Sequence, residues 1–271
     1  MTYIGGINIS EMEYFSGLSD FIRMTFVQAI IFATIAILIF LYGMIGALQK
    51  WGSGTIGYAL EPQAGQKGSA IRFLKTWWHQ VTEASHAPHA KPLLEVLILD
   101  IIFQRRILKR SSLRWIMHFS IFAGWMTLFS LSGLMFAVEM IDKIGIELPF
   151  TAAQFRDFLS FPNYVFGYIL LVGVLIALIR RLFVAEVREA SIMYDWVLLA
   201  GVLIITVTGF FADGIRNGLV WGLGLDPASA PPAALFHSII SLLFCIAAIP
   251  YTKYIHVIAT PLAILANKGG E

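Results

Sequence analysis

The chain has 271 residues, of which 58% are apolar and 13% charged, and its formal net charge is +2 at pH 7. A soluble globular domain carries about 25% charged residues, so this composition excludes a water-soluble globule and indicates a protein solvated by a lipid bilayer. The small net charge provides no basic field, so the sequence also excludes a nucleic-acid partner.

Uncharged apolar segments predict five membrane spans, because a helix needs about 20 mostly apolar residues to cross the hydrocarbon core. The predicted transmembrane helices cover residues 22–49, 115–139, 158–180, 195–213 and 233–256. A sixth apolar stretch, residues 254–267, is too short to span and contains Pro261, so we expect it to lie at the membrane surface. The pattern predicts an all-α integral membrane protein, with residues 1–271 forming a single membrane domain.

The distribution of Lys and Arg predicts the orientation of these spans. Five spans place 15 of the 19 basic residues on one face of the membrane and the remaining 4 on the other. Cytoplasmic loops retain Lys and Arg, so we expect the N-terminus outside, the C-terminus in the cytoplasm, and a multi-pass location in the cell membrane.

The predicted cytoplasmic loop, residues 50–112, is the one place where a soluble partner could dock broadly. Within it, residues 93–108 (LLEVLILDIIFQRRIL) are apolar on most of a helical surface, with charges interspersed. Such a helix lies either on the membrane or against a partner, and the sequence leaves both readings open. The basic residues that follow are of the kind that also binds phospholipid headgroups, so membrane lipid is an expected contact of this loop.

The chain contains a single cysteine, Cys245, inside an apolar run. One thiol builds neither an internal disulfide, nor a four-cysteine zinc site, nor a cysteine-ligated iron–sulfur cluster, so any such chemistry belongs to a partner. The loop histidines His79, His86 and His89 also lack a cysteine nearby. We interpret these histidines as solvated linker residues rather than as a metal site.

Two histidines lie at matching depth near the predicted cytoplasmic face. His118 begins the second span and His256 ends the fifth. Two neutral imidazoles on different helices can ligate one haem iron from opposite sides, so the pair predicts a haem b site. Ser120, Ala123 and Gly124 provide a small-residue surface for a flat macrocycle or for a neighbouring helix. The alternative is a pair of interfacial histidines that bind headgroups or backbone.

His237 lies near the outer start of the fifth span, 19 residues before His256. This separation is about 28 Å along a straight helix and about 100° around it, so one haem cannot use both histidines. We therefore assign His237 to a second, outer site, either as a ligand of another haem or as a hydrogen-bond partner of a lipid-soluble redox carrier. Pro250 is expected to kink the helix between the two histidines.

Several charged residues at span ends are candidates for a proton relay near that outer site. Ionisable groups close to membrane depth are often functional, although such residues more often only mark where a span ends. The candidates are Glu139, Asp195, Asp213 and Arg216.

Two segments carry a family resemblance. LLEVLILDIIFQRRILKRSSLRWIMHFSIFAGW (93–125) and HSIISLLFCIAAIPYTKYIH (237–256) resemble the five-span b-type cytochromes of the nitrate reductase gamma-subunit superfamily, most specifically in the ending P-[FY]-[ST]-[KR]-x-x-H. Together with FSGLSDFIRMTFVQ (15–28) and HVIATPLAILANKGGE (256–271), they resemble the cytochrome b subunits of the membrane-bound heterodisulfide reductases of methanogenic archaea.

The resemblance implies an electron-transfer subunit that oxidises dihydromethanophenazine and passes electrons through haem b to a cytoplasmic iron–sulfur subunit. That partner reduces the mixed disulfide of coenzyme M and coenzyme B, and we expect it to dock on residues 50–112 and 257–271. The resemblance implies that His118 and His256 ligate one haem and that His237 is the outer histidine. Nitrate reductase gamma subunits have a second histidine where this chain has Leu128, so the second ligand of any outer haem stays unassigned.

Two other readings of the sequence remain open. The first is a cytochrome b subunit of a related quinol-oxidising complex of sulfur or nitrate metabolism. The second is a non-redox membrane anchor or transporter, which accounts for the spans but not for two histidines at matching depth.

Overall fold

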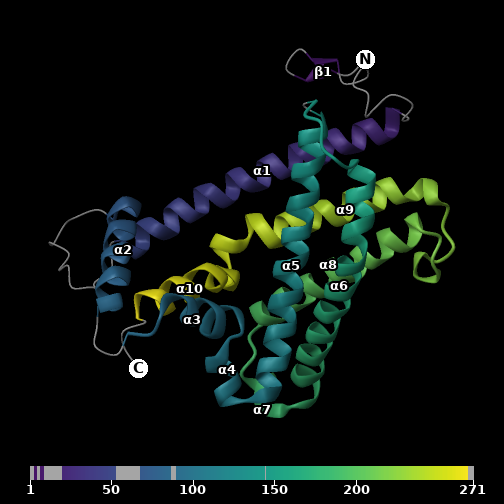
Figure 1. Ribbon diagram of the computed structural model, residues 1–271. Coiled ribbons are helices and arrows are strands. Elements are labelled where there is room, and N and C mark those ends of the chain that lie inside the picture. The colour runs from purple at the N-terminus through teal and green to yellow at the C-terminus, as the bar shows by residue number, and fades with distance from the viewer. Residues whose placement is uncertain are drawn as a thin grey trace. The chain divides into compact units, whose positions relative to one another are not determined.

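The computed structural model of the chain describes residues 3–4, 7–8, 20–52, 68–86, 90–143 and 145–267. Parts of the predicted docking segments, residues 53–67, 87–89 and 268–271, therefore lie outside the described residues, as does His89. Figure 1 shows that long helices make up most of the described chain. A short antiparallel pair joins β1 (Tyr3–Ile4) and β2 (Ile7–Asn8).

Five helical segments are long and apolar enough to cross a membrane, which confirms the all-α fold class and the predicted number of spans. These segments are Val27–Trp51, Ser112–Asp142, Ala152–Phe183, Met193–Arg216 and Pro227–Ala247. The helices that carry them are α1 (Asp20–Trp51), α5 (Ser112–Lys143), α6 (Ala152–Phe183), α8 (Met193–Arg216) and α9 (Ala230–Leu242). Which face each terminus occupies remains a prediction.

Shorter helices lie between the spans and after the last one. They comprise α2 (Ala70–His86), α3 (Leu93–Glu95), α4 (Arg105–Arg110), α7 (Ala185–Glu189) and α10 (His256–Ala266). Two π-helices are η3 (Val96–Ile102) and η6 (Leu243–Ala247). The 3-10 turns are η4 (Val220–Gly222), η5 (Pro227–Ser229), η7 (Ile249–Tyr251) and η8 (Lys253–Ile255).

The third spanning helix begins earlier than the apolar run predicts, at Ala152 rather than residue 158. A capping box accounts for the difference. The Thr151 hydroxyl accepts a hydrogen bond from the Gln154 backbone at 3.2 Å, and the Gln154 side chain accepts one from the Thr151 backbone at 2.9 Å. This reciprocal pair stabilises a helix start in a polar segment that hydropathy alone does not assign to a helix.

The last spanning segment ends at Ala247, whereas the sequence analysis extended one helix over 233–256. The α-helix changes to the π-helix η6, in which the Ala248 amide donates to the Leu243 carbonyl at 2.9 Å. Pro250 then lies in the 3-10 turn η7. Since proline lacks the amide hydrogen that a continuing helix needs, the helix breaks here instead of kinking. His256 consequently begins a new helix, α10.

The predicted interfacial helix over 93–108 is also interrupted. It consists of α3, the π-helix η3 and α4, with a break at Gln104, whose backbone is left-handed at φ 53°. Non-glycine residues rarely adopt this conformation, so the apolar pattern does not reveal the break.

The chain divides into two compact units, and the expectation that residues 1–271 form a single membrane domain stays a prediction. The first unit contains Met1–Ile31 and Leu113–Ile240, and the second contains Phe32–Ser112 and Ser241–Glu271. Both units include apolar spanning helices, so no shift in composition marks the division.

In the first unit, α5 and α6 approach each other through small residues. A Cβ atom added to Gly124 would lie 2.7 Å from Leu170 Cβ, and one added to Gly173 would lie 2.8 Å from Ser120 Cβ. The small-residue surface of Ser120 and Gly124 therefore packs against a neighbouring helix. The sequence analysis proposed either a macrocycle or a neighbouring helix for this surface, and the structure shows a helix there.

Because α5 and α6 approach so closely, a side chain added at their contact is expected to lower the stability of the protein. Gly173→Ala is expected to destabilise the protein by about 1–3 kcal/mol, because overpacking forces the backbone to shift; the added carbon would lie 2.9 Å from the Ile121 backbone nitrogen. Gly133→Ala is the matched control, since nothing lies within 4 Å of a Cβ added there. Thermal unfolding in detergent should show a lower Tm for Gly173→Ala alone, and equal Tm values for the two variants would contradict the packing argument.

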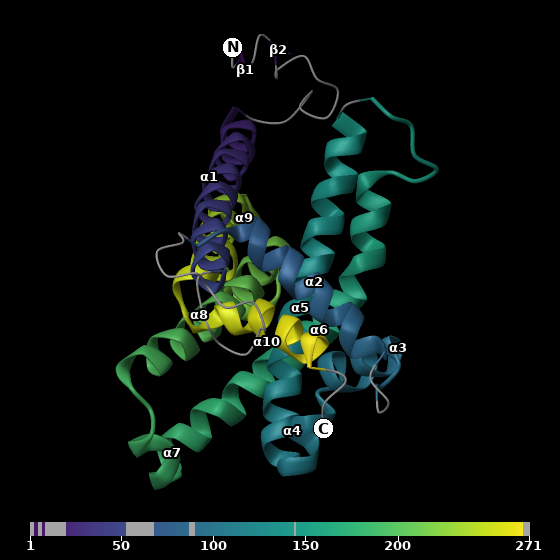
Figure 2. The same cartoon turned by 90° about the vertical axis from the view of Figure 1, so that its left-hand side faces the viewer.

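In the second unit, α10 packs against α2 and η3, as Figure 2 shows for α10 and α2. The Trp77 indole donates a hydrogen bond to the Leu262 carbonyl at 2.9 Å, and the Tyr251 hydroxyl donates one to the Ile39 carbonyl at 3.2 Å. The long loop and the C-terminal tail, which are far apart in sequence, therefore form one structural unit.

Candidate functional site

His237 lies on α9 with its imidazole against α8. Its Nδ1 is 3.1 Å from the Thr208 hydroxyl oxygen, and a Cβ atom added to Gly209 would lie 3.0 Å from the imidazole Cε1. The missing side chain at Gly209 therefore lets the ring approach the α8 backbone. The structure brings three residues from two helices together at this point, all within the first unit. We refer to His237, Thr208 and Gly209 as the outer histidine site.

One of the candidate relay acids lies one turn along α8 from this site. Asp213 is four positions after Gly209, hence on the same face and about 6 Å further along the helix axis. The Tyr164 hydroxyl of α6 donates a hydrogen bond to one Asp213 oxygen. Arg216 and Asn217 each donate to the other oxygen at 2.9 Å. Asp213 is therefore held between α6 and the end of α8.

The other candidate acids have local partners. Glu139 forms an ion pair with Arg156, which joins the end of α5 to the start of α6. Asp195 accepts a hydrogen bond from the Ile192 backbone at 3.2 Å and so caps the start of α8. Among the proposed relay acids, Asp213 is the one that lies within about one helical turn of Gly209 along α8.

His118 lies on α5 in the first unit. Ser120 faces α6, and residues two positions apart on an α-helix point about 200° apart. Ile121, which also lies against Gly173 of α6, is only about 60° from His118 around the helix. His118 therefore lies at the edge of the α5 surface that packs against α6.

His256 begins α10 in the second unit. Its Nδ1 lies 2.5 Å from the Lys253 carbonyl oxygen. Because a carbonyl only accepts, Nδ1 carries the proton and Nε2 carries the lone pair that a metal would take. Metal-ligating histidines commonly donate their second ring N–H to a backbone carbonyl in this way. The donor chemistry of His256 thus fits an axial haem ligand.

The predicted pairing of His118 with His256 joins residues of the two units, and it stays a prediction. The ideal-helix separation between His237 and His256 no longer applies, since η6, η7 and η8 interrupt the helix between them.

The loop histidines do not form a metal cluster in the part of the chain that the structure describes. His79 lies 3.3 Å from Glu83, and His86 Nδ1 lies 2.8 Å from the Thr82 carbonyl, both along α2. These contacts are local to one exposed helix.

A partly buried ion cluster joins α3 and η3 to α4. Arg105 donates to Asp100 and to Glu95, each at 2.9 Å, and Asp100 is 4% exposed. Burial opposes ionisation of Asp100, but the hydrogen bond and charge of Arg105, with the charges of Arg106 and Lys91, outweigh it and lower the pKa of this carboxyl below 3.8. Asp100 is therefore ionised at neutral pH and keeps Arg105 folded back across the break at Gln104.

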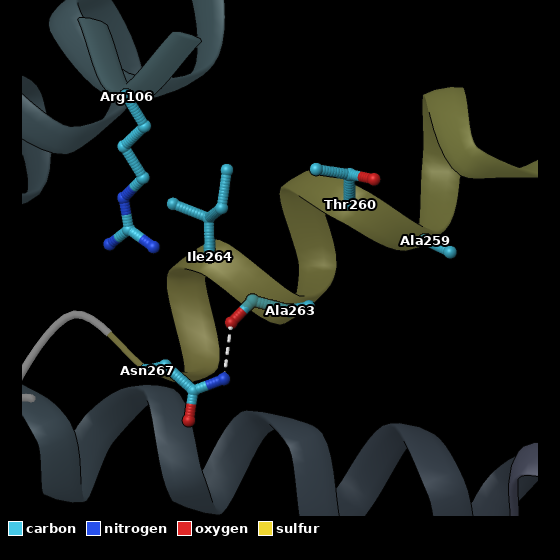
Figure 3. Close-up of a pocket in the computed structure, with 6 residues that line it drawn as sticks. All are labelled: Arg106, Ala259, Thr260, Ala263, Ile264 and Asn267. Atoms are coloured by element: carbon cyan, nitrogen blue, oxygen red, sulfur yellow. Dashed lines mark hydrogen bonds between the residues drawn. The ribbon is translucent and has the colours of Figure 1, made fainter. Parts of the chain in front are cut away.

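Beside this cluster, α4 and α10 border an open groove of about 330 Å³. Figure 3 shows the Arg106 side chain extending toward Ile264, while the Asn267 amide bonds back to the Ala263 carbonyl. Ala259 and Thr260 line the rest of the groove. One cationic side chain thus stands over a largely apolar floor, on residues of the predicted docking surface.

Sequence reasoning identified His237 and Asp213 but missed Thr208, Gly209 and Tyr164. The Thr-Gly pair in an otherwise aliphatic span is a weak signal of close helix packing. Nothing in the sequence connects that pair with a histidine 29 residues later.

The comparisons with known proteins agree with one another. A family profile described as the E subunit of dihydromethanophenazine:CoB–CoM heterodisulfide reductase matches residues 94–264. Proteins of that name are 76% identical in Methanosarcina acetivorans, over 97% of this chain and 99% of the relative, and 76% identical in Methanosarcina mazei, over 96% and 100%. A third, in Methanosarcina thermophila, is 74% identical over 96% of this chain and 99% of the relative.

No solved structure matches the chain. The relatives' names describe a subunit of a heterodisulfide reductase, which is an oxidoreductase complex. A profile match over more than half of the chain and identity above 70% along nearly its whole length show the relationship. The chain belongs to the family of the E subunits of dihydromethanophenazine:CoB–CoM heterodisulfide reductase.

Proposed function

We propose that this protein is the membrane cytochrome b of a heterodisulfide reductase. It oxidises dihydromethanophenazine and passes electrons through haem b to a cytoplasmic iron–sulfur subunit, which reduces the coenzyme M–coenzyme B heterodisulfide. The 76% identity to a named subunit over 97% of the chain carries the proposal. The single cysteine supports this division of labour, because one thiol holds neither a cluster nor a redox disulfide.

His118 and His256 would hold the haem near the cytoplasmic face. When bound between two imidazoles, haem b supplies one-electron transfer. The chain contributes orientation, because the Lys253 carbonyl fixes the tautomer of His256. Two imidazoles would fill both axial positions of the iron, which is the ligation of a low-spin site.

A visible spectrum of the purified chain tests this proposal most directly. We expect the dithionite-reduced protein to show the alpha band of b-type haem. A colourless protein that retains its fold would contradict the proposal and favour a non-redox anchor or transporter. Turnover with a quinol but not with a reduced phenazine would indicate a related sulfur or nitrate complex.

The outer histidine site is the proposed place of carrier oxidation or, as the second candidate, of another haem. A carrier oxidised near the outer face releases its protons outward while its electrons move inward, and this arrangement conserves energy. The shared α8 face of Gly209 and Asp213 supports the choice of this end of the span, because a carboxylate near the site can receive a proton. Asp213 is favoured over Glu139 by position, because it lies about one helical turn from Gly209 on α8, whereas Glu139 lies on α5. Each of the two carboxylates is paired with an arginine.

Residues 50–112 and 257–271 are the proposed docking surface for the iron–sulfur subunit. The packing of α10 against α2 and η3 supports the proposal, since it joins both segments in one unit. Exposed basic side chains, Arg106 among them, would mainly change the association rate and its salt dependence.

Site-directed crosslinking checks this surface. In a Cys245→Ser background, Thr260→Cys in the groove is expected to crosslink to the iron–sulfur subunit in the assembled complex. Asp226→Cys is the control, because Asp226 is exposed in the predicted outer connection. Crosslinks from Asp226→Cys would show that both the orientation and the electron path are wrong.

A further inference from the structure

The hydrogen bonds of Thr208 determine which atom donates to which at the outer histidine site. The Thr208 hydroxyl has a single proton. That proton faces backbone carbonyls of its own helix, Ile204 at 2.8 Å and Ile205 at 3.1 Å. With its proton engaged there, the hydroxyl oxygen meets His237 Nδ1 at 3.1 Å as an acceptor.

The tautomer of His237 follows from this arrangement. Nδ1 must carry the proton in order to donate to Thr208, and Nε2 of the neutral ring then carries the lone pair. The Thr208 contact therefore favours the tautomer of His237 that carries its proton on Nδ1.

We propose that Thr208 is a positioning residue that locks His237 in the Nδ1–H tautomer and presents the Nε2 lone pair to the ligand of the outer site. The inference rests on the proposed function, because it supposes that His237 serves that site. A lone pair requires an electron-pair acceptor. The site therefore takes either a haem iron or the ring N–H of a reduced phenazine, and it disfavours the oxidised carrier, whose ring nitrogens only accept.

Gly209 completes the positioning. A methyl group at this position would approach Cε1 to 3.0 Å and Nε2 to 3.4 Å. The bare backbone of Gly209 thus allows the imidazole to reach the Thr208 hydroxyl. Thr208 supplies the polar contact and Gly209 supplies the space.

The tautomer can be measured without turnover. Full-length protein with 15N-labelled histidine is compared with His237→Gln, which identifies the His237 resonances by their absence. We expect a protonated Nδ1 and an unprotonated Nε2 in the parent protein and in Thr208→Ser, which keeps the hydroxyl. Thr208→Val removes the hydroxyl at constant shape and should populate the other tautomer.

Thr206→Val is the matched control for loss of a hydroxyl from α8. Thr206 is buried, and its hydroxyl bonds only the Val202 carbonyl, at 2.8 Å, among the described residues. It should leave the His237 resonances unchanged. Unchanged resonances in Thr208→Val, or equal changes in Thr206→Val and Thr208→Val, would overturn the proposal.

Two binding measurements identify the ligand. Loss of a residue that orients a ligating side chain typically weakens binding by about 10–100-fold. Thr208→Val should therefore weaken the binding of either a reduced water-soluble phenazine or a second haem to that extent. A raised Kd for the phenazine at constant haem content identifies the N–H donor, and a lower haem-to-protein ratio identifies iron.

The same measurements distinguish a failure of the positioning role of Thr208 from a failure of the outer histidine site. If His237→Gln impairs the outer site but Thr208→Val leaves both quantities at the parent value, the positioning role fails and the outer site stands. If His237→Gln also leaves phenazine Kd, haem content and turnover unchanged, the outer site itself fails.

Discussion

Replacing either His118 or His256 by alanine is expected to remove the low-spin haem b from the purified protein. A bis-imidazole iron needs both axial ligands, and alanine supplies no electron pair. The expected result is loss of the low-spin signal in the visible and EPR spectra of each variant. Both variants should lose the same haem, because the two histidines are proposed to share one iron.

His79→Ala is the control for this experiment. His79 is an exposed residue of α2 that lies beside Glu83. Its variant should keep the full low-spin signal. Retention of that signal in His118→Ala or in His256→Ala would show that the assignment of the ligand pair is wrong, whatever the family relationship implies.

Replacing His237 by glutamine is expected to abolish oxidation of the reduced carrier while dithionite still reduces the cytoplasmic haem. Glutamine is polar and similar in length, but it lacks the ring nitrogen that the Thr208 contact orients. Carrier-driven turnover should fall by at least about tenfold, in line with the loss of an oriented contact. Steady-state oxidation of a reduced phenazine, with heterodisulfide as acceptor, measures this in the assembled complex.

Haem quantitation distinguishes the two roles considered for His237. If haem content stays constant while turnover falls, His237 contacts the carrier. If haem content falls as well, His237 is a ligand of a second haem. Turnover at the parent level in His237→Gln would contradict the outer site in both forms.

Hydropathy was sufficient to predict the spanning helices but not their ends. An apolar run of about 20 residues is a local property of the sequence, and such a run is long enough to cross the hydrocarbon core of a bilayer as a helix. The ends depend on single contacts instead, such as the Thr151–Gln154 capping box that starts α6 at Ala152. The left-handed Gln104 and the π-helix η3 divide a segment whose apolar pattern is continuous.

The candidate site, like the helices, could be predicted from the sequence only in part. His237 could be singled out from the sequence, since a lone histidine in an apolar span is conspicuous. Its orientation could not, because Thr208 lies 29 residues away on another helix. Likewise, the sequence offered Glu139 and Asp213 as equal candidates, and the position of Asp213 on α8, about one helical turn from Gly209, distinguishes them.

By itself, the sequence determined that this protein is an all-α membrane protein with five spans, one thiol and a histidine, His237, in its last span, since all of these follow from composition and local pattern. Only the tertiary structure decided that α6, rather than a macrocycle, packs on Ser120 and Gly124. It also decided that the loop and tail form one unit, and that Thr208 holds His237. These are contacts between residues distant in sequence, which depend on helix packing and leave no periodic signal in the chain.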